Sequence, residues 1–169
     1  MGTLSGAPTL DGLAYFARYY PSDAAAIRWL QVHVAEREPA GRPLAVGPAE
    51  PRQPIIVEAT GGSYSQYGRV SMITGFPTLL GWDFHELQWR GTAVAAEISR
   101  RRADVETIYR SRDPNLVLGL LKQYGVTYVY VGPLERETYA RDDPSVFDKF
   151  RVFMDVVYDR NGVTIYQVR

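Results

Sequence analysis

The stretch "RDPNLVLGLLKQYGVTYVYVGP", residues 112–133, constrains the fold more than any other part of the chain. Asp113 and Pro114 are typical of the N-cap and first residue of a helix, and Gly125 is a typical stop. A β-branched and aromatic run at 126–131 follows at once, so helix, glycine and strand form half of a parallel α/β unit. The helix residues expected to point inward are Leu116, Leu120 and Leu121.

The rest of the chain supplies further helices and strands around this unit. Hydrophobic residues recur at helical spacing at about 23–37 and about 92–110. A short β-branched run at 55–57 is typical of a strand buried on both faces. Two strand-like runs close the chain around Asn161 and Gly162, a strong hairpin signal. The sequence predicts an α/β fold with a mixed, mainly parallel sheet, flanked by helices and ending in an antiparallel hairpin.

Length and composition fit one domain of ordinary size. The chain has 169 residues, of which 46% are hydrophobic and 22% charged, enough for a real core. We expect a single domain over residues 1–169, with a leading segment at 8–20 and an irregular, proline-rich loop at 38–54. No apolar run approaches the ~20 residues that span a bilayer, so the chain as given is expected to be soluble.

Several classes of function are excluded by composition and missing motifs. Nineteen basic residues balance nineteen acidic ones, so no general field attracts nucleic acid or an anionic membrane. The absence of cysteine excludes a disulfide framework and thiolate catalysis. A P-loop, a Rossmann fingerprint and a G-x-S-x-G elbow are all missing. We expect no cofactor and assign no catalytic residue.

Two segments concentrate the chemically capable side chains. "GGSYSQYGRVS", residues 61–71, follows the strand at 55–57, and ligands of α/β sheets prefer such loops. Gly61 and Gly62 permit a positive φ or a close approach. "GWDFHELQWRG", residues 81–91, holds two tryptophans, a histidine, two carboxylates and an arginine. The candidate substrate-binding residues are Tyr64, Tyr67, Arg69, Asp83, His85, Glu86, Trp89 and Arg90.

The segment at 81–91 has alternative interpretations. Asp83, His85 and Glu86 could bind a metal, but the one other histidine, His33, does not supply ligand spacing. The same three residues could serve as acid and base. They could also form a capped turn, with Asp83 at the N-cap, Glu86 near N3 and the tryptophans as anchors. We favour the capped turn and expect no metal site.

Carbohydrate or lipid-headgroup binding is a further interpretation. Twelve tyrosines and three tryptophans are a high load for this length, and rings beside charged groups suit the faces and hydroxyls of sugars. Arg69 and Arg90 could hold a phosphate beside the amides of Gly61 and Gly62. Alternatively, most tyrosines pack the sheet from alternating strand positions. The strand tyrosines are Tyr128, Tyr130, Tyr158 and Tyr166.

The segments "TLDGLAYF", "PSDAAAIRWL", "GRVSMITGFPTLLGWDFHELQWRG" and "LLKQYGVTYVYVGPLERETY" resemble the C-terminal soluble part of the YYY-domain family. These are large multi-spanning membrane proteins that are similar to the glycosyltransferase-C superfamily, whose members use polyprenyl-phosphate-linked sugars. The resemblance covers about Thr9 to Arg169. It implies that this chain is a piece of a larger membrane protein.

The resemblance implies an extracytoplasmic domain that binds or positions a sugar or polyprenyl-phosphate substrate without being the catalytic centre. The implied partner is the transmembrane portion of the parent protein, and no nucleic-acid partner is expected. An alternative is a structural or interaction module that docks on that membrane portion. A third possibility is a freestanding hydrolase that uses Glu86 or His85.

Overall fold

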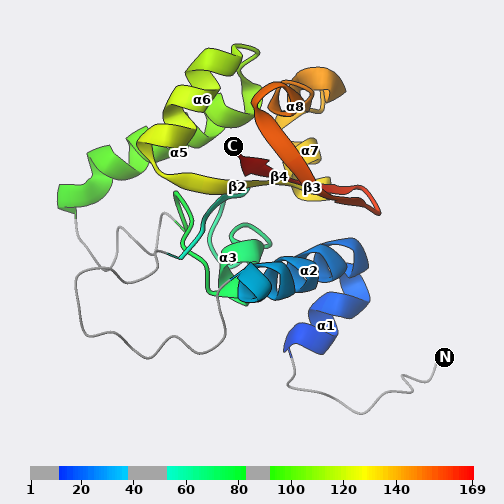
Figure 1. Cartoon of the computed structure of the whole chain (residues 1–169). Coiled ribbons are helices and arrows are strands. Elements are labelled where there is room, and N and C mark those ends of the chain that lie inside the picture. Colours follow the sequence, from blue (N-terminus) through cyan, green and yellow to red (C-terminus); the bar gives the residue numbers. More distant parts are fainter. Residues whose placement is uncertain (1–11, 38–52, 83–91) are drawn as a thin grey trace, which may run out of the picture.

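A four-stranded sheet with helices on both faces organises the chain (Figure 1). The computed structural model describes residues 12–37, 53–82 and 92–169. The strands are β1 (Ile55–Val57), β2 (Val126–Val131), β3 (Met154–Arg160) and β4 (Val163–Val168). They lie in the order β1-β2-β4-β3, so the strands that are last in the sequence form one side of the sheet.

The pairing of the strands confirms the α/β class, the mixed sheet and the C-terminal hairpin. β1 runs parallel to β2, whereas β4 runs antiparallel to both β2 and β3. Within the described residues, parallel pairing is limited to β1 with β2 and to an isolated bridge between Ile56 and Thr78. The sheet therefore has less parallel pairing than expected. The physical reason is that β4 returns along β2 and occupies the place that a third parallel strand would need.

The helices lie in two layers (Figure 1). One layer holds α1 (Gly12–Tyr19), α2 (Pro21–Arg37) and α3 (Arg69–Thr74). The other holds α5 (Ala95–Arg110), α6 (Pro114–Gln123), α7 (Pro133–Tyr139) and α8 (Phe150–Phe153). Short 3-10 helices occupy Thr92–Val94 and Pro144–Phe147.

The predicted helices at 23–37 and 92–110 correspond to α2 and to a 3-10 turn followed by α5. The leading segment at 8–20 contains a helix, α1, that the sequence did not predict. The loop expected at 38–54 lies almost entirely outside the described residues.

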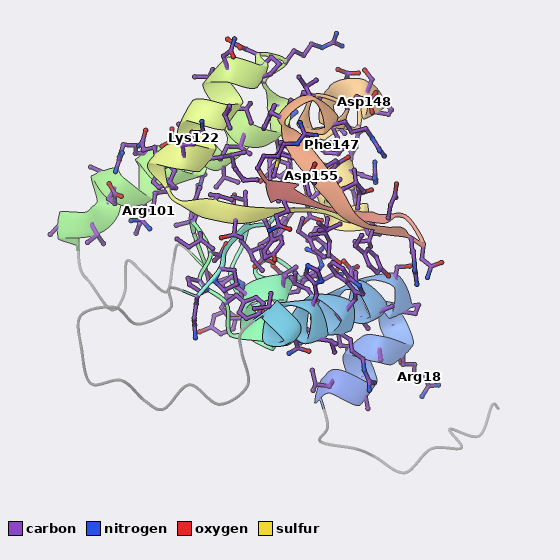
Figure 2. All side chains as sticks on the ribbon, in the orientation of Figure 1. Arg18, Arg101, Lys122, Phe147, Asp148 and Asp155 are labelled. Carbon is purple, nitrogen blue, oxygen red and sulfur yellow. The ribbon has the colours of Figure 1, made fainter. Side chains whose placement is uncertain are left out.

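Two apolar cores lie on opposite faces of the sheet, each filled by side chains of the strands and of one helix layer (Figure 2). Alternate residues of β2 serve the two cores: Val129 packs towards α5 and α6, whereas Tyr128 and Tyr130 pack towards α2. The four strand tyrosines are all buried, which confirms that they pack the sheet. Burial of β2 on both faces explains why five of its six residues, all except Thr127, are apolar or aromatic.

The joint between α6 and β2 has the predicted construction. The carboxylate of Asp113 accepts a hydrogen bond from the backbone N–H of Asn115 at 2.9 Å, and Gly125 has a φ of +63°. Leu120 and Leu121 pack inward as expected. The expectation for Leu116 is wrong, because its side chain is 49% exposed and Val117 is buried instead. Val117 and Leu121 are four residues apart and therefore share the inward face of the helix.

The β3–β4 hairpin turns at the predicted pair of residues. Asn161 has a φ of 52° and Gly162 a φ of 78°, so both lie in the left-handed region. Two consecutive left-handed residues form the turn whose twist matches that of the flanking strands. The Asn-Gly signal is therefore confirmed in its detailed geometry.

Two of the leucines of α6, Leu116 and Leu121, provide a matched test of this packing. Leu121→Ala should lower the free energy of unfolding by about 2–5 kcal/mol, because the truncated side chain leaves a cavity in a fully buried site. Leu116→Ala should change it by about 0.5 kcal/mol or less, because this side chain is half exposed. Urea denaturation of both variants measures the difference, and equal losses would contradict the observed orientation of α6.

Candidate functional site

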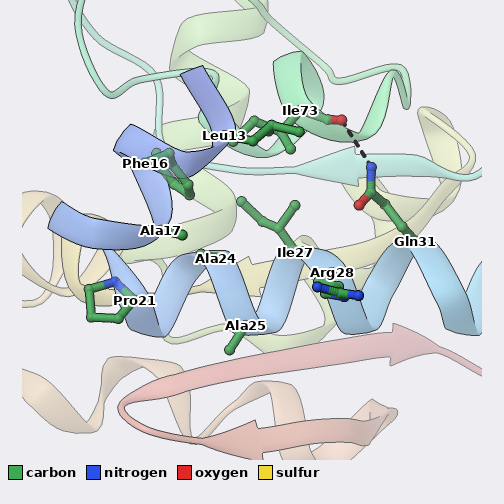
Figure 3. A pocket seen from close by; sticks show the side chains of 10 residues that line it. All are labelled: Leu13, Phe16, Ala17, Pro21, Ala24, Ala25, Ile27, Arg28, Gln31 and Ile73. Carbon is green, nitrogen blue, oxygen red and sulfur yellow. Dashed lines mark hydrogen bonds between the residues drawn. The ribbon is translucent and has the colours of Figure 1, made fainter. Parts of the chain in front are cut away.

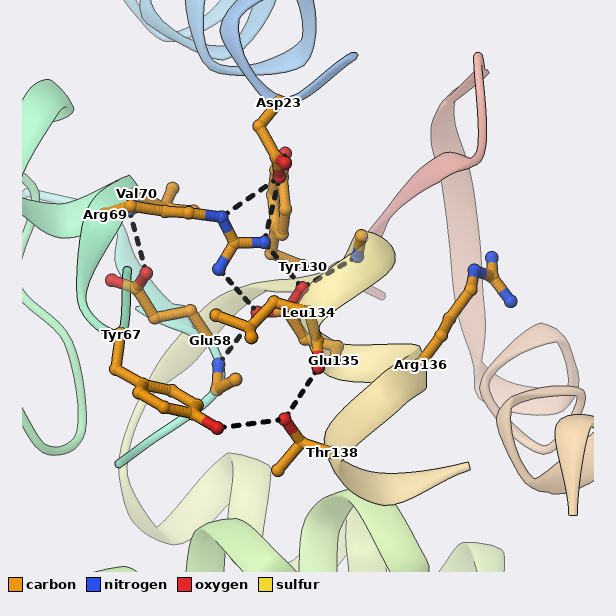
Figure 4. A network of polar contacts seen from close by, with 12 residues as sticks. Asp23, Glu58, Tyr67, Arg69, Val70, Tyr130, Leu134, Glu135, Arg136 and Thr138 are labelled. Atoms are coloured by element: carbon orange, nitrogen blue, oxygen red, sulfur yellow. Dashed lines mark hydrogen bonds and ion pairs between the residues drawn. The ribbon is translucent and has the colours of Figure 1, made fainter. Parts of the chain in front are cut away.

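A buried network of charged groups lies where β1 and β2 end (Figure 4). The guanidinium of Arg69, at the start of α3, lies between the carboxylates of Asp23 on α2 and Glu135 on α7. Its Nε and Nη2 donate to Oδ1 of Asp23 at 3.0 and 2.8 Å. Its Nη1 and Nη2 donate to the two oxygens of Glu135 at 3.0 and 2.8 Å, which is a bidentate pair.

Three further donors complete this network. The hydroxyl of Tyr130 donates to Oδ1 of Asp23 at 2.8 Å. The backbone N–H groups of Ala59 and Gly132 donate to Glu135 at 2.9 and 2.8 Å. The Arg69 network, defined as Asp23, Arg69, Tyr130 and Glu135, therefore joins α2, α3 and α7 to the ends of both parallel strands. Its side chains are almost completely buried, and each has polar partners.

Burial and neighbouring charges shift the pKa values of two groups of the network, Arg69 and Tyr130. Burial opposes the charge on Arg69, but the carboxylates of Glu135 and Asp23 outweigh this effect and raise the pKa of its guanidinium. Burial, reinforced by the charge of Asp23, raises the pKa of the Tyr130 hydroxyl. Arg69 therefore stays charged and Tyr130 stays a neutral donor.

Gly132 is enclosed by the network. A Cβ atom at this position would lie 2.9 Å from Oδ1 of Asp23 and 3.0 Å from Nη2 of Arg69. Any larger residue would therefore displace the groups that hold the network together. This close approach explains why a glycine follows β2 directly.

Glu58, the first residue after β1, holds α3 in place. Its buried carboxylate accepts hydrogen bonds from the N–H groups of Val70 and Ser71, both at 2.8 Å. It thereby satisfies the first turn of α3, where Gly68 offers no capping side chain. Burial raises the pKa of this carboxyl, an effect that the hydrogen bonds of Ser71 and Val70 oppose. Glu58 fixes the helix end from which Arg69 extends.

The loop between β1 and α3 is attached to α7. The ring of Tyr67 lies so close to Gly61 that a Cβ there would approach a ring carbon to 2.3 Å. The hydroxyls of Tyr67 and Thr138 lie 3.4 Å apart, and the N–H of Thr60 donates to the Tyr139 hydroxyl at 3.2 Å. The close-approach role predicted for Gly61 is confirmed. A positive φ occurs at neither Gly61 nor Gly62.

A pocket of about 810 Å³ opens between α1 and this loop. We call it the Tyr64 pocket; it is lined by Gly12, Leu13, Tyr15, Phe16, Tyr20, Tyr64, Ser65, Gln66, Arg69, Met72 and Ile73. Tyr64 has a φ of 58°, which a residue with a side chain rarely adopts, and the residue is 74% exposed. The amide of Gln66 donates to the Tyr20 hydroxyl at 2.6 Å. Backbone strain of this kind often accompanies a functional role.

The structure brings together two of the candidate residues, Tyr64 and Arg69, in this pocket. Tyr67 instead faces α7 and lines a neighbouring polar pocket with Arg110 and Thr138. Trp82 anchors the start of the 81–91 segment, since its indole N–H donates to the carbonyl of Tyr67. Asp83, His85, Glu86, Trp89 and Arg90 lie outside the described residues, so their roles stay predictions.

Sequence reasoning missed the partners of Arg69 and the pocket wall formed by α1. Asp23 and Glu135 lie 46 and 66 residues from Arg69 in the chain, and no local pattern marks such pairs. Gln66 could have been found, because it lies between two hydroxyl residues of the candidate loop. Glu58 also carried a signal, since a carboxylate directly after a buried strand must find partners.

The described residues offer binding groups rather than a metal centre. No group of three or more histidines and carboxylates within residues 12–37, 53–82 and 92–169 is placed to hold a metal ion. His33 is half-buried, and its ring is stacked on that of Trp29 with the ring centroids 4.4 Å apart. None of the helices that the structure describes is both long and apolar enough to span a membrane.

Comparisons with known proteins assign neither a family nor a function to the chain. No family model and no curated protein matches the chain. Among solved structures, the chain is similar to the C-terminal globular domain of an oligosaccharyltransferase from Archaeoglobus fulgidus. The TM-score is 0.41 at 10% identity, and the match covers 86% of this chain and 95% of that domain. Function does not transfer between proteins at this level of similarity.

The Arg69 network should contribute far more to stability than an exposed ion pair. Arg69→Met should lower the free energy of unfolding by about 3–5 kcal/mol, because it leaves two buried carboxylates without their cation. The matched control is Arg112→Met, whose pair with Asp143 is exposed and should be worth about 1 kcal/mol or less. Urea denaturation measures both.

If Arg69→Met does not fold, Asp23→Asn provides the milder test. This variant keeps the size of the side chain but removes the charge that faces Arg69, and should cost about 1–3 kcal/mol. Losses below 1 kcal/mol for both variants would contradict a stabilising role for the network.

Proposed function

We propose that the domain binds the sugar part of a substrate in the Tyr64 pocket, as an extracytoplasmic, non-catalytic domain of a polytopic membrane glycosyltransferase. The observation that carries this proposal is Tyr64 itself. It is largely exposed at the edge of a pocket with several polar groups, its ring lies 5.3 Å from that of Trp82, and its backbone has a conformation that tyrosine rarely adopts.

The chemistry of the pocket suits a sugar. Tyr15 and Tyr64 present exposed aromatic rings, against which the C–H face of a sugar ring can pack. The Tyr20 hydroxyl, the Gln66 amide and Ser65 supply donors and acceptors for sugar hydroxyls. Binding sites for small molecules commonly combine an apolar wall with a few polar groups in this way.

The pocket favours a neutral sugar over a phosphate. Arg69 is the one charged residue among the described residues that line it. Its guanidinium already donates to Asp23 and Glu135, so a phosphate would have to compete with two buried carboxylates. We therefore assign Arg69 the role of a positioning residue, which holds the start of α3 beside the pocket through its ion pairs with Asp23 and Glu135. A lipid phosphate attached to the sugar would lie outside this pocket.

The membrane context of the proposal is supported by the sequence resemblance to the YYY-domain family. In that context, the transmembrane portion of the parent protein carries the catalytic groups and is the partner of this domain. A second candidate function is docking on that membrane portion, which the exposed side chains of Leu13 and Met72 favour. If docking is the function, substitutions at the Tyr64 pocket would weaken docking, and the unsubstituted domain would bind no sugar.

NMR titration with neutral oligosaccharides tests sugar binding. We expect amide shifts at residues 15–20 and 64–66, which line or adjoin the pocket. Tyr64→Ala and Gln66→Ala should each weaken binding about three- to tenfold, because each removes one ring or amide contact. Val152→Ala, at an exposed apolar residue of α8, is the control and should bind normally.

Two results would contradict the proposal. The first is that no oligosaccharide of mannose, glucose, galactose or N-acetylglucosamine shifts the amide resonances of residues 64–66. The second is unchanged affinity in Tyr64→Ala, which would place any binding elsewhere on the domain. Thermal denaturation of each variant confirms that a loss of affinity does not reflect unfolding.

A further inference from the structure

We infer that the outer surface of α1 and the adjoining part of α2 bind the interface of a lipid bilayer that contains anionic lipids. We call this surface the α1 face; it comprises Leu13, Tyr15, Arg18, Tyr19 and Arg28. The inference rests on exposure, on charge and on a groove beneath the helix, and it does not depend on sugar binding.

The α1 face exposes large apolar side chains. Leu13, Tyr15 and Tyr19 are 60%, 59% and 56% exposed, and α1 contains no buried residue. The rings of Tyr15 and Tyr19 lie 4.5 Å apart and form one aromatic surface. Tyrosine combines an apolar ring with a polar hydroxyl and is therefore enriched at the boundary between lipid and water. The α1 face therefore exposes the kind of side chain that is enriched at a bilayer interface.

The exposed charged side chains that the structure describes in the layer of α1, α2 and α3 are all positive. Among the described side chains of residues 12–34 and 53–82, the carboxylates are Asp23 and Glu58, and both are buried. Arg18 and Arg28 are exposed, so this layer presents positive charge although the whole chain is neutral. Exposed arginines beside apolar side chains are complementary to anionic lipid headgroups.

A groove of about 490 Å³ lies between α1, α2 and α3 (Figure 3). Its lining is mainly apolar and includes Leu13, Phe16, Ala24, Ile27 and Ile73. Arg28 also lines the groove. Part of an acyl chain of a lipid can therefore enter the groove while the phosphate of the same lipid binds the guanidinium of Arg28.

A second copy of the chain fits this surface less well than a lipid. A symmetric contact would bring the same patch of both copies together. Arg18 and Arg28 would then face the arginines of the other copy. The described part of the layer has no exposed carboxylate to pair with them. The charge of the α1 face therefore favours an anionic partner over a copy of itself.

Vesicle flotation tests the inference. The chain should float with vesicles of phosphatidylcholine and phosphatidylglycerol, bind less in high salt, and bind weakly to phosphatidylcholine alone. The Arg18→Glu/Arg28→Glu variant should bind at least about thirtyfold more weakly, given about 1 kcal/mol for each arginine lost near the surface and further repulsion from the new carboxylates. Tyr19→Ser should lower binding at both low and high salt, because it removes apolar contact. The matched control, Arg112→Glu/Arg151→Glu, changes two exposed arginines elsewhere and should bind normally.

The inference is overturned if the chain does not float with anionic vesicles, or if the α1-face variants float as well as the control. It is also overturned if light scattering shows a dimer without lipid that Tyr19→Ser dissociates. Arg18, Tyr19 and Arg28 do not line the Tyr64 pocket, so these variants should keep sugar binding. The two proposals can therefore fail separately.

Discussion

The ion pairs of Arg69 with Asp23 and Glu135 hold together the end of the sheet where its two parallel strands finish. Helices from both layers meet at this one guanidinium, and two backbone N–H groups bind one of its carboxylate partners. Burying three charges is costly, and the cost is offset only while every group keeps its partners. The position of α3, and of the loop before it, depends on this set of contacts.

This arrangement gives the candidate binding loop a rigid support. Glu58 and Arg69 fix α3 from two sides, and Tyr67 attaches the loop to α7, so Tyr64 projects from a backbone that is held at both ends. A binding site is more effective when its groups are positioned before the ligand arrives. By contrast, α1 has no buried residue, and it forms both the outer wall of the Tyr64 pocket and the α1 face.

Local signals in the sequence predicted those parts of the fold that local geometry decides. The cap at Asp113, the stop at Gly125 and the turn at Asn161-Gly162 were all readable from residue type. The inward face of α6 was read partly wrongly, because leucine occupies both faces of the helix and hydrophobicity alone did not place Leu116. The share of parallel pairing was overestimated, because strand order depends on long-range contacts.

The candidate site was predictable to a similar extent. Tyr64 and Arg69 lie close together in the sequence and indeed share a pocket. The carboxylates that bind Arg69 were not predicted, since Asp23 and Glu135 lie on distant helices whose local patterns show only that they are helices. A buried arginine looks the same in a sequence as an exposed one, so its structural role became visible only in three dimensions.

If the Arg69 network fixes the end of the sheet as firmly as the core fixes its middle, this end should not open locally. Amide hydrogen exchange at Ala59 and Gly132, whose N–H groups donate to Glu135, tests this claim most directly. We predict that both amides exchange as slowly as that of Val129 in the centre of β2, through global unfolding. Exchange at both positions that is much faster than at Val129 would show that this end opens locally and would contradict the account.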